Sequence, residues 1–158
     1  MTRLGFVLAV VLGLTSATVP APAIAQDDAA RVTGAGEAMF PAGAIFNGIA
    51  LSGLTLGQGV FIARDGSAAG QFQAVLVGAS LLGAHQNVTV EGEVRSGFAI
   101  AVGSATFSGT ATVDMGDGTP PVPGVPFTVT ASTGGLSLIL GGTALPTATL
   151  TAGSITIE

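Results

Sequence analysis

Residues 104–115 read Ser-Ala-Thr-Phe-Ser-Gly-Thr-Ala-Thr-Val-Asp-Met, and in this stretch apolar side chains alternate with hydroxyl side chains. Successive side chains of an extended chain point to opposite faces, so the alternation separates the two kinds. One face carries the apolar members Ala105, Phe107, Ala111, Val113 and Met115. The stretch therefore predicts a β-strand with one buried and one wet side, which is typical of antiparallel sheets.

The same alternation extends to much of the chain on either side. Residues 87–95 and 125–131 repeat it, with valine, phenylalanine and alanine opposite threonine, glutamate and arginine. Further strands are expected at residues 31–40, 45–56, 59–64, 71–77, 136–140 and 147–158, separated by the turn signals Asp65-Gly66, Asp117-Gly118, Thr133-Gly134-Gly135 and Gly141-Gly142. About eight to ten short strands at this spacing predict an all-β fold, an antiparallel β-sandwich, with a small β-barrel as the alternative.

The apolar residues of the segment 67–82 fit both the period of a helix and the two-residue period of a strand. Phe72, Val75, Leu76, Ala79 and Leu82 have helical spacing as well as a partial alternation. Glycines at 70 and 78 would each weaken a helix by about 1 kcal/mol relative to alanine. The segment is therefore interpreted as a strand, with a helix as the alternative.

The first 25 residues have the features of a cleavable secretory signal. Arg3 supplies a short positive segment, and Leu4–Leu14 is an apolar run too short to span a bilayer, which takes about 20 residues. Ala23-Ile24-Ala25 offers the small residues that a signal peptidase accepts, so cleavage is expected after Ala25. A short flexible N-terminus at 26–30 and a single all-β domain at 31–158 would remain, in the periplasm or secreted from a bacterial cell.

Composition narrows the possible chemistry. The chain has no cysteine, which excludes disulfides and thiolate chemistry. Loss of the leader would leave three arginines against nine acidic residues, and such an acidic domain repels phosphate backbones, so nucleic acid is not expected as a partner. After the leader there is no apolar run long enough for a membrane span in the mature form. The expected partner is an unidentified protein or envelope component.

Glu91 and Glu93 are the first candidate site. Because the two glutamates are two residues apart on one strand, their Cα atoms should lie about 6–7 Å apart. This separation is comparable to the distance of about 5–9 Å between the two catalytic carboxyls of a glycosidase. Such enzymes also bind sugars with Trp and Tyr, which this chain lacks. With Arg95 on the same face, the row is more simply a solvated strand face that discourages aggregation.

Asp114 and Asp117 are candidate calcium ligands, because carboxylates and carbonyls at close spacing suit this cation. Their spacing lacks the pattern of an EF-hand, and Asp117-Gly118 is more simply a hairpin turn. His85 is the only histidine and is expected in an exposed loop. The Gly34-Ala35-Gly36 run has Met39 where a dinucleotide fingerprint needs glycine, so no cofactor is expected.

Residues 104–158 resemble a family of secreted bacterial domains. The segments Phe107–Thr112, Val125–Thr130 and Gly153–Ile157 carry the likeness, and the family is the post-COAP-like domain found on exported bacterial proteins. The resemblance implies a secreted β-sandwich and brings no catalytic residues with it.

The expected function is therefore a non-enzymatic one, a structural or protein-interaction role at the cell envelope or outside the cell. The first alternative is a carbohydrate-binding module, although phenylalanine is the only aromatic residue type available to hold a sugar. The second is a small glycoside hydrolase that uses Glu91 and Glu93.

Overall fold

The computed structural model describes residues 28–101 and 103–158, and the predicted leader with its cleavage residues Ala23 and Ala25 lies outside this part of the chain. Every named element of the described residues is a β-strand, and every strand pairing between them is antiparallel. Within the same residues, no helix has the length and apolar character that crossing a membrane requires. The predicted all-β, antiparallel class is confirmed.

Ten strands follow one another along the described chain. They are β1 (Asp28–Met39), β2 (Ile45–Phe46), β3 (Ile49–Ala63), β4 (Ser67–Ala79), β5 (Val88–Ala101), β6 (Ser104–Asp114), β7 (Val122–Ser132), β8 (Gly135–Leu140), β9 (Thr143–Ala144) and β10 (Ala148–Ile157).

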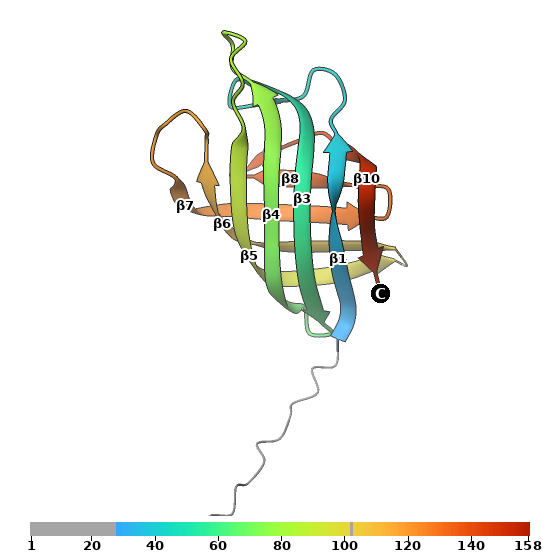
Figure 1. The fold of residues 1–158 in the computed structure, drawn as a ribbon. Coiled ribbons are helices and arrows are strands. Elements are labelled where there is room, and N and C mark those ends of the chain that lie inside the picture. Colours follow the sequence, from blue (N-terminus) through green and yellow to red (C-terminus); the bar gives the residue numbers. More distant parts are fainter. Residues whose placement is uncertain (1–27, 102) are drawn as a thin grey trace, which may run out of the picture.

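The strands form one sheet that folds over on itself. Successive strands from β2 to β8 pair as neighbours, β8 also pairs with β10, and β1 lies between β10 and β3. Val32 of β1, for example, is opposite Ile157 of β10 on one side and Val60 of β3 on the other. In Figure 1, β1, β3, β4 and β5 form the near layer, and β7 and β8 cross behind it. The two halves therefore face each other across a shared interior.

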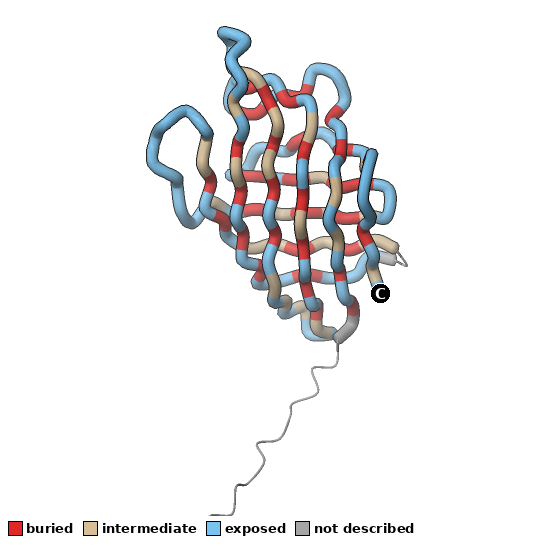
Figure 2. Tube along the Cα trace, in the orientation of Figure 1, coloured by how far each residue is buried: buried red, intermediate tan, exposed pale blue. Residues whose placement is uncertain are grey.

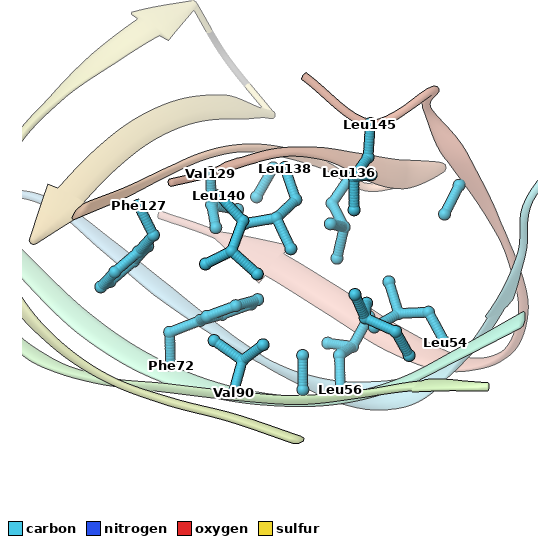
Figure 3. Close-up of a cluster of buried hydrophobic side chains, with 14 of the residues drawn as sticks. Leu54, Leu56, Phe72, Val90, Phe127, Val129, Leu136, Leu138, Leu140 and Leu145 are labelled. Atoms are coloured by element: carbon cyan, nitrogen blue, oxygen red, sulfur yellow. The ribbon is translucent and has the colours of Figure 1, made fainter. Parts of the chain in front are cut away.

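Apolar side chains from alternate positions of the strands fill this interior. Figure 2 shows the alternation as buried and exposed segments along each strand. Phe72 of β4 is fully buried, with its ring centroid 5.6 Å from that of Phe127 on β7 and 6.1 Å from that of Phe107 on β6. Figure 3 shows Leu136, Leu138 and Leu140 pointing toward the side chains of the near layer. The inward positions predicted at 88, 90, 94, 105, 107, 111, 113, 127, 129 and 131 are buried, whereas those at 115 and 125 are half-buried.

The predicted strand boundaries between residues 45 and 64 are wrong. The two strands expected at 45–56 and 59–64 are instead the short β2 and the long β3, with a turn at Asn47-Gly48 between them. Both turn residues have positive φ, 47° and 81°, which suits the tight turn of a two-residue hairpin. Gly57 and Gly59 do not interrupt β3, because its pairing with β1 and β4 continues through both.

The segment at 67–82 is a strand as far as Ala79, and its last three residues belong to a loop. A side chain at Gly78 would meet the Cγ2 atom of Ile49 at 2.6 Å. Gly78 therefore allows β4 to lie close to the start of β3. Tertiary packing, rather than local spacing, excludes the helical alternative.

Gln58 is a polar residue inside the apolar core. It is 9% exposed, and neither Nε2 nor Oε1 of its amide has a hydrogen-bond partner among the described residues. Leaving such a group unpaired costs about 1–3 kcal/mol. We expect Gln58→Leu to raise the free energy of unfolding by about this amount, measured by urea denaturation.

The matched control for this change is Gln73→Leu, because Gln73 is exposed on the outer face of β4. It should alter stability by no more than about 0.5 kcal/mol. A loss of stability in Gln58→Leu would contradict the prediction, since it would mean that the amide is satisfied in solution.

Candidate functional site

Three neighbouring strands display two rows of polar side chains on the outer face of the sheet. Gln71 of β4 is opposite Glu93 of β5, which is opposite Thr110 of β6. The second row runs in the same way through residues Gln73, Glu91 and Thr112. All six side chains are exposed. The strands thus bring both candidate glutamates together with two amides and two hydroxyls.

The packing beneath both glutamates agrees with the outward direction that the sequence alternation predicts for them. Gly92 lies between them and faces inward, where a β-carbon would meet the Phe127 ring at 2.6 Å. The ring occupies the space that a side chain at 92 would need. Strand β5 therefore lies directly over the cluster of Phe72, Phe107 and Phe127. Residues 91 and 93 must then project to the other side of the strand.

The two rows line an open polar groove of about 360 Å³, which we call the polar groove. A smaller hollow of about 150 Å³ shares Glu91 and Thr112 with it and reaches Asp114. Arg95 Nη2 lies 3.1 Å from Glu93 Oε2, in an exposed ion pair. The groove offers hydrogen-bond acceptors and donors suited to a polyhydroxylated or cationic ligand.

The two aspartates predicted as calcium candidates are used within their own loop. Asp114 Oδ1 accepts a hydrogen bond of 2.8 Å from the Gly116 N–H, and Asp117 Oδ1 accepts two from Thr119, at 2.9 Å from N–H and 2.6 Å from the hydroxyl. These contacts are typical of the aspartate-initiated turns that connect strands. Among the described residues, no three acidic, histidine or cysteine side chains group together as metal ligands would. Both carboxylates thus shape the backbone at and after the end of β6, within the connection 115–121 to β7.

The Thr119 hydroxyl is the main cause that lowers the pKa of Asp117, with the Thr119 N–H adding to it. A folded-state pKa below the unfolded one stabilises the fold above the unfolded pKa, and this contribution is lost as the pH falls through the folded value. We expect Thr119→Val to move the pKa of Asp117 up toward its ordinary range, measured by carboxyl NMR titration. Asp65, whose pKa is lowered by the equivalent contacts from Ser67, is the internal control and should not move. An unchanged Asp117 pKa would contradict this assignment.

His85 lies exposed in the loop 80–87 between β4 and β5, as predicted, and its backbone forms an isolated bridge with Ala79. The same loop contains a feature that sequence reasoning missed. Leu81 and Leu82 are 90% and 96% exposed at its tip. This loop projects beyond the arrowhead of β4 at the top of Figure 1. Two large apolar residues directly before Gly83 are the available signal, but their spacing also fits the end of the strand predicted at 67–82.

A second missed feature is an apolar hollow of about 230 Å³, which we call the apolar hollow. Its lining comes from four separate parts of the chain, chiefly Phe46, Met115, Val122, Val125 and Leu140. None of its lining residues is charged. No local pattern predicts it, because it depends on how distant strand ends come together.

Comparison of the chain with protein-family models, with characterised proteins and with solved structures found no match.

Proposed function

We propose that this chain is a non-enzymatic binding domain that acts outside the cytoplasm and contacts protein through the loops at one end of the sheet. The supporting observation is the exposure of Leu81 and Leu82, 90% and 96%, on a loop that the backbone holds in place. Single exposed apolar residues are common on protein surfaces. Two adjacent leucines at the tip of a projecting loop instead suit insertion into an apolar site of a partner.

Hydrogen bonds hold these leucines in a defined turn. The Gly83 N–H donates to the Ser80 carbonyl at 2.8 Å, and the Ser80 N–H donates to the Ala84 carbonyl at 2.9 Å. Leu81 and Leu82 are thus the two central residues of a closed turn, where glycine, asparagine or proline would be the usual choice. A held turn loses little conformational entropy on binding, which favours a role in recognition.

The test is capture of a partner by the purified protein from the envelope fraction of its own culture. We expect a partner to be retained by the unaltered protein and lost with the double change Leu81→Ser and Leu82→Ser. Phe98→Ser is the matched control, because Phe98 is 59% exposed near the end of β5. Capture that survives the leucine changes but fails with Phe98→Ser would overturn the proposal.

Export is a separate part of the proposal and has its own test. Expression of the full chain with a C-terminal tag should yield a product whose first residue is Gln26, recovered from the periplasm or medium. Ala25→Arg should block this processing, because a signal peptidase requires a small residue there. An unprocessed tagged chain in the cytoplasm would contradict export.

The polar groove supports a second candidate function, the binding of carbohydrate. Its two Gln-Glu-Thr rows present amide, carboxylate and hydroxyl groups side by side, which can pair with sugar hydroxyls. We expect micromolar binding on a glycan array, lost in Gln73→Ala and retained in Gln58→Leu, which leaves the outer face unchanged. Turnover of a bound glycan that disappears in Glu91→Gln with Glu93→Gln would instead favour the hydrolase alternative.

A further inference from the structure

The apolar hollow and the loop 80–87, which carries Leu81 and Leu82 at its tip, lie at the same end of the fold. Met115 lines the hollow, and its carbonyl accepts a hydrogen bond of 3.0 Å from the Gln86 side chain of the loop 80–87. The loop 80–87 and the connection that follows β6 also meet at Gly116, where a β-carbon would overlap the carbonyl of Asn87. One end of the molecule therefore carries both an apolar projection and an apolar recess.

The recess has the size and chemistry of a site for an aliphatic side chain. Its volume is about 230 Å³, whereas a cavity of roughly 150 Å³ with an aliphatic and aromatic lining suffices for a benzene molecule. Sites for small-molecule ligands usually measure about 300–1,000 Å³, so the hollow is small for that purpose. A leucine side chain fits this volume and this lining.

We propose that the occupant of the apolar hollow is the Leu81-Leu82 turn of a second copy of this chain, and that two copies exchange these turns in a symmetric dimer. This inference rests on the proposed function and names its partner. Because projection and recess are neighbours, one two-fold axis beside them can place each turn at the hollow of the other copy. Such an exchange closes at two copies and leaves neither pair of leucines exposed.

Charge favours this contact over other parts of the surface. Each exported copy carries three arginines against nine acidic residues, so two copies repel each other at long range. The loop 80–87 and the lining of the hollow contain no Asp, Glu, Lys or Arg. The proposed contact therefore brings uncharged surfaces together, and added salt should strengthen the dimer by screening the remaining repulsion.

Sedimentation of the protein recovered after export of the full chain tests the dimer. We expect a twofold mass at high micromolar concentration, reduced to the monomer mass by Leu81→Ser with Leu82→Ser. Val122→Asp should have the same effect, because it places a charge at the hollow where Val122 is 53% exposed. Phe98→Ser should remain dimeric, and circular dichroism should show the same strand content in every variant.

Cross-linking tests the geometry directly, because the chain has no cysteine of its own. One preparation carries Leu82→Cys and a second, larger by a tag, carries Val122→Cys. Their mixture should form a disulfide-linked species of the summed mass on mild oxidation. Mixing Phe98→Cys with Val122→Cys should not form one.

Three results would overturn the inference. They are a monomer at all concentrations, a dimer that persists without the leucines, and sedimentation of the monomer with phosphatidylcholine vesicles that requires the leucines. If the envelope pull-down then still captures a different protein through Leu81 and Leu82, the proposed function stands and only the identity of the partner is wrong. If nothing is captured, both proposals fail.

Discussion

Phe72→Ala is expected to lower the free energy of unfolding by about 3–5 kcal/mol, the usual cost of removing a buried phenylalanine. Phe72 is fully buried on β4 and stacks on Phe127 of the opposite layer, with an angle of 23° between the ring planes. Its removal deletes a contact that joins the two layers and leaves a cavity that neighbouring backbone cannot fill. Small domains are stable by only about 5–15 kcal/mol, so the loss would be a large share of the total.

Urea denaturation followed by circular dichroism measures this effect. Phe98→Ala is the matched control, because the same side chain is removed from a position that is 59% exposed, and there we expect a change of no more than about 0.5 kcal/mol. Equal losses in the two variants would mean that Phe72 does not join the layers in solution.

Gly153→Ala is expected to cost about 3 kcal/mol, because two effects add at this position. Gly153 has a φ of 86°, in the left-handed region that strains any other residue. A β-carbon there would overlap the carbonyl of Ala35 and crowd the Cα of Gly36 on the adjoining strand β1. Gly153 thus allows β10 to pair closely with β1 at Gly36, next to the point between Glu37 and Ala38 where the pairing register shifts.

Gly142→Ala separates the two effects. Gly142 has nearly the same φ, 85°, but nothing lies within 4 Å of a β-carbon placed on it. It should therefore lose only about 1–2 kcal/mol, the cost of the backbone conformation alone. If both variants lost the same amount, close approach between β1 and β10 would not be the cause.

The inward and outward positions of the strands were predictable from sequence. The alternation at Ala105, Phe107 and Ala111 decides which side chains are buried, because the two-residue period of a strand is a local property of the backbone. For the same reason the outward direction of Glu91 and Glu93 needed no tertiary information. The sequence also predicts turns with a strong local signature, such as Asp65-Gly66. It does not predict the turn at Asn47-Gly48, because the apolar residues around it indicate a continuous strand.

The arrangement of these strands in space was decided by tertiary structure alone. Pairing of β1 with both β10 and β3 joins residues from opposite ends of the described chain, and no local pattern encodes such a register. The polar groove forms because strand pairing places Gln73 on one side of Glu91 and Thr112 on the other. The apolar hollow forms because four separate segments of the chain come together. Local periodicity determines the faces of each strand, but which faces and ends become neighbours depends on the packing of the whole core.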